Sequence, residues 1–295
     1  MSPKLDPMTC IVSACHCAGG FPQEANLERY TMNEITTERS GSLLRVQLNR
    51  PAKQNAMTSS MYVTMADLLN GTAKDDELRV VLWHGAGDSF CAGNDIEDFI
   101  KNPPGPGESP QVCLMDALLN FDKPIVAAVH GMAIGVGTTM LTHCDFVYAG
   151  ESAKFQMPFI NLGLVPEFGS TCSVPALVGH VRAAELILLG RAFDGTRAAE
   201  LGLVTRVIPD EMLLTTATET AQQLAQEPAS ALRACKRLMK WSTRQQVEDA
   251  MRAENEEFAL RLHSAETREA MAAFLKKHSP DFTRTMLSTR TERAP

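Results

Sequence analysis

The chain has 295 residues, of which 44% are hydrophobic and 21% are charged, as in an ordinary globular protein. This apolar fraction excludes disorder for the bulk of the chain. The net charge of −7, from 28 basic and 35 acidic residues without a basic block, argues against nucleic acid as a partner.

The first segment, residues 1–35, shows neither a clean strand period nor a clean helix period over most of its length. We predict that it is a disordered N-terminal extension, with Met32 as an alternative start of the natural protein. Its Cys15-His16-Cys17 triplet could touch a metal ion. No second ligand pair stands at zinc-site spacing, so we expect no metal site.

Strands and helices alternate along residues 36–208. Apolar runs that alternate or are β-branched predict strands at 43–48, 80–83, 125–129 and 146–148. Apolar residues at helical spacing predict helices at 58–69, 115–119 and 138–142. A repeated order of strand, helix and strand implies right-handed crossovers and a parallel sheet, so the predicted fold class is α/β.

The pattern changes toward the C-terminus. Residues 102–110 contain four prolines and two glycines, which predicts a mobile surface loop. Beyond residue 208, the composition is helical at 211–226, 229–240 and 243–277. We therefore expect an α/β body over residues 36–208 and a helical C-terminal region over residues 209–295.

Residues 124–144 contain no Asp, Glu, Lys or Arg, and a segment of this length could span a bilayer. Their glycines, threonines and β-branched beginning favour a buried strand, a turn and a buried helix, so no membrane is expected. The eight cysteines are spread along the chain, which predicts reduced thiols and a cytoplasmic location.

Two glycine-rich turns each follow a predicted strand. The first is Phe90-Cys91-Ala92-Gly93-Asn94-Asp95-Ile96, and the second is His130-Gly131-Met132-Ala133-Ile134-Gly135-Val136-Gly137. Turns of this kind point backbone N–H groups into open space. Two such turns can offer two donors to one oxygen atom, which makes an oxyanion hole. The alternative for each is a plain structural turn.

Glu167 is the sole acidic residue between Glu151 and Glu185, and its neighbours are apolar. Burial there would raise the pKa of its carboxyl group and make it usable as a base. The alternative is a carboxylate in the first turn of a helix, placed by Pro166 and stabilised by the helix dipole.

These three segments, in this order and spacing, resemble the crotonase superfamily, which is the enoyl-CoA hydratase/isomerase family. Residues 48–56 and 190–204 match the family as well, so the resemblance covers about residues 36–282. It implies a crotonase-like spiral of ββα units with a helical C-terminal trimerisation region, and a homotrimer or dimer of trimers. It also implies an acyl-CoA thioester substrate and no separate cofactor, since coenzyme A is part of the substrate.

The resemblance assigns the oxyanion hole to the backbone N–H groups of Asn94 and Val136. Because the backbone donates, we expect the two side chains to be free to vary. A solvated surface charge is the alternative role for each lysine among the implied contacts. The implied contacts with substrate or coenzyme A are Lys53, Gln54, Ala56, Ala92, Gly93, Asp95, Ile96, Gly135, Phe274 and Lys277.

The superfamily runs several reactions, so its acid positions decide among them. Where hydratases of the family carry two glutamates, this chain has Thr139 and Phe159. Neither can orient water and shuttle its proton, which argues against hydration. Glu167, preceded by Gly163-Leu164-Val165-Pro166, matches the single catalytic glutamate of Δ3,Δ2-enoyl-CoA isomerases related to the peroxisomal type. We therefore predict an isomerase of fatty-acid metabolism, active in β-oxidation, with Glu167 as its base.

Other functions stay open at this point. One is another crotonase reaction, such as weak hydration, thioester hydrolysis or C–C cleavage. Another is a non-catalytic acyl-CoA-binding role, which would leave coenzyme A affinity without turnover and make Glu167 dispensable.

Overall fold

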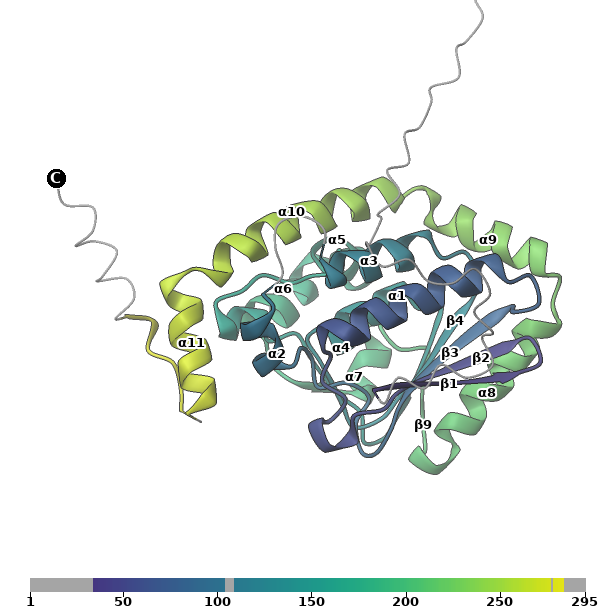
Figure 1. Ribbon diagram of the computed structural model, residues 1–295, viewed down its shortest axis with the longest axis horizontal. Helices are drawn as coiled ribbons and strands as arrows, with labels where there is room; N and C mark the ends of the chain where they lie inside the picture. The colour runs from purple at the N-terminus through teal and green to yellow at the C-terminus, as the bar shows by residue number, and fades with distance from the viewer. Residues whose placement is uncertain (1–33, 104–108, 277, 284–295) are drawn as a thin grey trace, which may run out of the picture.

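The computed structural model describes residues 34–103, 109–276 and 278–283. A six-stranded sheet forms its centre, in the order β1-β2-β3-β4-β6-β9 (Figure 1). Strand β1 is antiparallel to β2, and the other neighbours in this sheet pair in parallel. The strands are β1 Ile35–Ser40, β2 Leu43–Leu48, β3 Val80–Gly85, β4 Ile125–Val129, β6 Phe146–Gly150 and β9 Arg206–Ile208.

The four predicted strands are confirmed as β2, β3, β4 and β6. Strand β4 is buried along its whole length, which explains its continuous apolar run, because both faces of a central parallel strand are covered. A second sheet joins three short strands in the order β5-β7-β8. Their bounds are β5 Met132–Ile134, β7 Lys154–Gln156 and β8 Phe193–Asp194.

Helices cover both faces of the main sheet. Helices α1 and α3 lie on one face and α8 lies on the other, while α9 and α10 run along the top of the view in Figure 1. The helices of the α/β body are α1 Ser59–Lys74, α2 Ile96–Lys101, α3 Pro110–Asn120, α4 Val136–Thr139, α5 Ser170–Val178, α6 His180–Leu189 and α7 Gly195–Glu200. The C-terminal helices are α8 Asp210–Gln226, α9 Ala229–Trp241, α10 Arg244–Leu262 and α11 Ala265–Leu275. Three short 3-10 helices are η1 Pro51–Lys53, η2 Met140–His143 and η3 Phe159–Leu162.

The helical C-terminal region is confirmed, with one break at His263 and Ser264 that separates α10 from α11. The predicted boundary at residue 36 is wrong. Ile35 is buried and pairs with Leu48 at the start of β1, because an edge strand against β2 completes the sheet. Residues 1–33, with the Cys15-His16-Cys17 triplet, lie outside the described residues, as do residues 104–108 of the proline-rich loop.

The uncharged stretch 124–144 folds as β4, β5, α4 and η2, so it is several buried elements rather than one long helix. Across the described residues, no helix combines the length and the apolar character that crossing a membrane requires.

A buried lysine joins helix α1 to strand β4. Lys123, which precedes β4, is 3% exposed. Its Nζ donates to the carbonyl oxygens of Thr72, Asp75 and Leu78 at 2.6, 2.7 and 2.8 Å. The last carbonyls of a helix have no partner within the helix, so the ammonium group caps α1 from another part of the chain.

We expect Lys123→Met to lower the free energy of unfolding by about 3 kcal/mol, because three buried carbonyls lose a charged donor. Urea denaturation followed by circular dichroism measures this loss. Lys74→Met is the matched control, since Lys74 lies exposed in the last turn of the same helix. Equal stability of the two variants would contradict the capping role.

Candidate active site

The first glycine-rich turn leaves the end of β3 and leads into α2. Cys91 N donates to Met132 O at 2.8 Å, and Ile134 N donates to Cys91 O at 2.9 Å, so the turn pairs with β5. On its other side, Gly93 O accepts from Met57 N at 2.7 Å. Gly93 has a φ of +94°, a conformation that strains residues with a Cβ atom. These bonds hold the turn on two sides.

The second turn lies directly against the first. Gly135 has a φ of +56°, and a Cβ atom placed on it would lie 3.9 Å from Gly93 Cα. Val136 follows as the first residue of α4, where backbone N–H groups have no partner within the helix. Within the described residues, the amides of Asn94 and Val136 donate to no other main-chain group. The structure thus brings the two predicted donors onto adjoining turns, while their oxyanion role stays a prediction.

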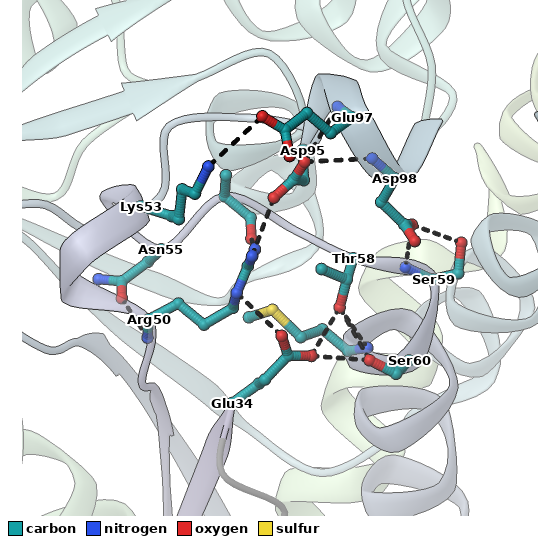
Figure 2. A network of polar contacts seen from close by, with 12 residues as sticks. Glu34, Arg50, Lys53, Asn55, Thr58, Ser59, Ser60, Asp95, Glu97 and Asp98 are labelled. Carbon is teal, nitrogen blue, oxygen red and sulfur yellow. Dashed lines mark hydrogen bonds and ion pairs between the residues drawn. The ribbon is translucent and has the colours of Figure 1, made fainter. Parts of the chain in front are cut away.

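An arginine ties the first turn to the loop after β2 (Figure 2). Arg50 forms ion pairs with Asp95 and Glu34, both at 2.9 Å, and also donates to the carbonyl oxygen of Ala56. Asp95 caps α2 by accepting from Glu97 N and Asp98 N. Burial acts to raise the pKa of Asp95, but its bonds to Arg50 and to these amides outweigh burial and lower it. The Asp95 carboxylate therefore holds the turn in place.

Glu167 lies between η3 and α5. Helix α5 begins at Ser170, after an N-cap at Gly169, so the alternative of a carboxylate in the first helical turn is wrong. The Glu167 residue is 4% exposed, and its Oε1 atom has no hydrogen-bond partner among the described residues. Burial, and then the charge of Glu254, raise the pKa of Glu167 to about 8, against a hydrogen bond from Asn94 that lowers it.

The Asn94 side chain has a contact in the site that the prediction, which used only its backbone amide, did not include. Its Oδ1 accepts a hydrogen bond from the hydroxyl of Tyr62 at 2.6 Å, and its side chain acts to lower the pKa of Glu167. This bond to Tyr62 fixes the orientation of the Asn94 amide, because only its oxygen can accept from the phenol. Burial, and then Glu167, raise the pKa of Tyr62 well above its usual value, so this hydroxyl stays protonated.

Tyr62 is a candidate site residue that the sequence pattern did not reveal. It lies on α1 and is fully buried, among methionines and leucines of the apolar helix face. A tyrosine on such an apolar helix face is expected to be an ordinary core residue. The residue that its hydroxyl bonds to, Asn94, is 32 residues away along the chain.

His143 supports the residue that follows Glu167. Its Nε2 hydrogen-bonds to the carbonyl oxygen of Phe168 at 2.8 Å, and the two ring centroids are 6.3 Å apart. Burial lowers the pKa of His143 to about 4, so the ring is neutral at pH 7 and donates this bond from Nε2. His143 is thus a buried residue that supports the turn after Glu167.

The two positions predicted to match the glutamates of hydratases are buried and carry no acid. Thr139 is completely buried, and its hydroxyl has no partner among the described residues. Phe159 is 5% exposed, and its Cζ would lie 3.9 Å from a Cβ atom on Gly135. An apolar ring therefore occupies the space beside the second turn, where a hydratase of the family has a carboxylate.

The residues predicted to bind coenzyme A are dispersed. Lys53 has a side chain that is 55% exposed and pairs with Glu97 at 3.7 Å (Figure 2). Gln54 holds the first turn through its carbonyl oxygen, which accepts from Ala92 N at 2.9 Å. Phe274 is 58% exposed on α11, and Lys277 lies outside the described residues.

A metal site finds no support in this arrangement. Over the described ranges, no three side chains of His, Cys, Asp or Glu come together in a way that could hold a metal ion. The polar groups of the site are one carboxylate, one amide, one phenol and two backbone N–H groups, which suits proton transfer beside a developing oxyanion.

Comparisons with known proteins agree with this geometry. The family model for enoyl-CoA hydratase/isomerase matches residues 38–285. The 1,2-epoxyphenylacetyl-CoA isomerase of Escherichia coli K12 is 34% identical over an alignment of 259 residues, and the match covers 85% of this chain and 99% of that protein. The enoyl-CoA delta isomerase 2 of Rattus norvegicus is 33% identical over 76% of this chain and 57% of its own length.

Solved structures give the same result. An enoyl-CoA hydratase/isomerase from Pseudoalteromonas atlantica T6c has 39% identity and a TM-score of 0.81, over 84% of this chain and 99% of its own. Pseudomonas aeruginosa OdaA has 43% identity and a TM-score of 0.80, over 82% and 98%. The likeness therefore extends over almost the whole described fold, including both glycine-rich turns and the segment of Glu167. The chain belongs to the enoyl-CoA hydratase/isomerase family, the crotonase superfamily.

Proposed function

We propose that this acyl-CoA-processing enzyme is a Δ3,Δ2-enoyl-CoA isomerase of fatty-acid β-oxidation. One observation carries the proposal. Glu167 is a buried carboxylate whose Oε1 has no hydrogen-bond partner among the described residues and whose pKa is raised by burial to about 8. The family's hydratase positions, Thr139 and Phe159, hold no second acid.

The reaction needs one base that takes and returns one proton. Glu167 removes a proton from C2 of a 3-enoyl-CoA, and the electrons of that C–H bond form a dienolate. The protonated Glu167 then delivers its proton to C4, which leaves the conjugated 2-enoyl-CoA. No atom is gained or lost, so the chemistry requires neither a metal nor a redox cofactor, and coenzyme A is part of the substrate.

The dienolate places negative charge on the thioester oxygen. In this proposal, the backbone amides of Asn94 and Val136 donate to that oxygen from their adjoining turns. Loss of one such donor typically raises a barrier by about 3 kcal/mol. The Arg50–Asp95 ion pair keeps the first amide in position, because it fixes the turn to the loop after β2.

The relatives support the family more strongly than the reaction. Two of them are named isomerases. A third, from Escherichia coli K12, is named 2,3-dehydroadipyl-CoA hydratase and is 31% identical over 252 residues. The choice of isomerisation therefore rests on which acids this chain has. Coenzyme A contacts at Lys53, Gln54, Ala56 and Phe274, and a cytoplasmic location, belong to the same proposal.

We also propose that the chain assembles as a homotrimer or a dimer of trimers. Leu238 and Trp241 lie one turn apart on α9 and are 72% and 80% exposed. Leu260 on α10 is 70% exposed. Large apolar side chains left in contact with water on neighbouring helices favour burial against another subunit.

The first prediction from the proposed function concerns Glu167 as the base. Purified protein mixed with a medium-chain 3-enoyl-CoA should produce a rapid ultraviolet rise from the conjugated thioester, and Glu167→Gln should slow it about 100- to 10,000-fold, because the base is lost. Glu151→Gln is the control, since Glu151 is exposed. No rise with the wild type, or equal rates for the wild type and Glu167→Gln, would reject the proposal.

The second prediction concerns pH. Glu167 must be ionised to accept a proton, and burial raises its pKa to about 8. We therefore expect kcat/KM for isomerisation to rise with pH through a midpoint near 8 and to level off above it. Initial rates across the range measure this midpoint. A midpoint near the ordinary value of a glutamate would show that the base is not desolvated in the free enzyme.

The third prediction concerns assembly. Light scattering should give a mass of three or six chains of 32.2 kDa, and Trp241→Glu should lower this mass, because it places a charge in the proposed contact. The variant changes Trp241 alone and leaves the neighbouring Lys240 unaltered. A monomeric wild type would reject the assembly without affecting the assignment of Glu167.

A further inference from the structure

Glu254 is a buried carboxylate on α10 that reaches the segment of Glu167. It is 4% exposed, and α10 packs against α5 (Figure 1). Its Oε2 accepts from Gly169 N at 2.6 Å. Its Oε1 accepts from Thr171 N at 2.7 Å and from Thr171 Oγ1 at 2.6 Å. All three donors lie within four residues of Glu167.

The segment that Glu254 holds has an unfavourable backbone. Phe168 has a φ of +63° and Gly169 a φ of +67°, so two successive residues adopt left-handed conformations, and one of them carries a Cβ atom. Such a conformation persists only where surrounding contacts enforce it. Helix α5 begins at Ser170. The N-cap residue of this helix is Gly169, which has no side chain to accept hydrogen bonds from the first amides of the helix.

Glu254 supplies what this turn lacks. A carboxylate from another helix performs the role of the N-cap side chain, since it accepts from the amides of Gly169 and Thr171. An ionised carboxylate only accepts hydrogen bonds. Because the Glu254 carboxyl group faces three donors, this environment suits its charged form. The fit is close, because a Cβ atom on Gly169 would lie 2.8 Å from Val247 Cγ1 of the same α10.

We propose that Glu254 is a positioning residue for the catalytic base: its carboxylate fixes the left-handed turn at Phe168 and Gly169 and thereby aims Glu167 at the substrate. The proposal rests on the proposed function, in which Glu167 is the base. Glu254 itself does not touch the substrate. It acts through the backbone of the turn, from a residue 85 positions later in the chain.

The charge of Glu254 has a second effect on the same group. Three titratable groups act on or respond to Glu167 from the elements packed around it: Tyr62 of α1, Cys91 of the first turn and Glu254 of α10. Tyr62 and Cys91 are neutral, since burial raises the pKa of both. Glu254 is the carboxylate among them. Burial raises its own pKa against the bonds from Thr171 and Gly169 that lower it, and in its ionised form its charge raises the pKa of Glu167.

The test is Glu254→Gln in the full chain. Glutamine keeps the size of the side chain and one acceptor oxygen, but its NH2 group must face a donor in the turn. We expect kcat for isomerisation to fall about 10- to 100-fold, because the base is displaced. We expect KM for the acyl-CoA to stay within about threefold, because binding contacts are unchanged. The midpoint of kcat/KM against pH should move down by about one unit, because a like charge is lost.

Glu256→Gln is the matched control. Glu256 lies two residues further along α10 and is exposed, so the variant removes the same charge from the same helix without touching the turn. It should leave kcat and the pH midpoint unchanged. A Glu254→Gln enzyme with wild-type kcat and a wild-type midpoint would overturn the proposal. A fall in kcat without a change of midpoint would overturn the electrostatic part.

A second variant guards against a folding defect in Glu254→Gln. Thr171→Val removes one of the three donors and keeps the backbone amide, and Thr171 is exposed enough to tolerate the change. It should lower kcat by a smaller factor in the same direction. An unchanged kcat in this variant, together with a Glu254→Gln protein that fails to fold, would count against positioning.

An infrared titration separates this proposal from the proposed function. The carboxyl band of protonated Glu167 is the band that Glu167→Gln removes, and its midpoint is measurable without turnover. If the wild type does not isomerise 3-enoyl-CoA, the proposed function fails, yet a lower midpoint in Glu254→Gln than in Glu256→Gln would still show that Glu254 acts on Glu167. Equal midpoints would overturn that action.

Discussion

Desolvation of the Glu167 carboxylate is the effect on which the rest of the site depends. A carboxylate in water is a weak base, and burial is the largest cause of its raised pKa here. A buried carboxyl group must still be oriented, yet Oε1 of Glu167 has no hydrogen-bond partner among the described residues. Further donors would orient the group better but would stabilise its charge and weaken it as a base.

The surroundings of Glu167 orient its carboxyl group and keep it a strong base through different contacts. Orientation comes from the backbone, since the carbonyl groups and amides of the turn bond to His143 and Glu254. The amide of Asn94, which Tyr62 fixes, acts on the side chain itself. The contacts from His143 and Glu254 therefore act on the backbone of the residues that follow Glu167, where they hold the segment without bonding to its carboxylate.

The same fold serves different reactions because the glycine-rich turns and the acids are independent of each other. The turns at Gly93 and Gly135 require only backbone geometry, and they are held by main-chain hydrogen bonds to β5 and β7. The acids lie on other segments, and replacing them leaves the turns intact. Phe159 illustrates this, because an aromatic ring packs beside Gly135 without disturbing the turn. Relatives named as hydratases and as isomerases are consistent with this independence.

The sequence by itself determined the parts that depend on local pattern. Strand β4 was predicted with its observed bounds, and the helical C-terminal region was predicted apart from the break at His263. Glu167 was identifiable because it is one acid in a long apolar segment. Local order also marked both glycine-rich turns, since each joins a strand to a helix and each needs a positive φ.

Only the tertiary structure decided the roles of Tyr62, the Asn94 side chain and Glu254. Each is polar within a helix or turn, and a pattern of burial along one helix cannot say which distant group a side chain meets. Tyr62 bonds across 32 residues, and Glu254 across 83 and 85. The edge strand at Ile35 was missed for the same reason, because its burial depends on pairing with β2. Contacts between segments far apart in the chain are set by packing, which local periodicity does not encode.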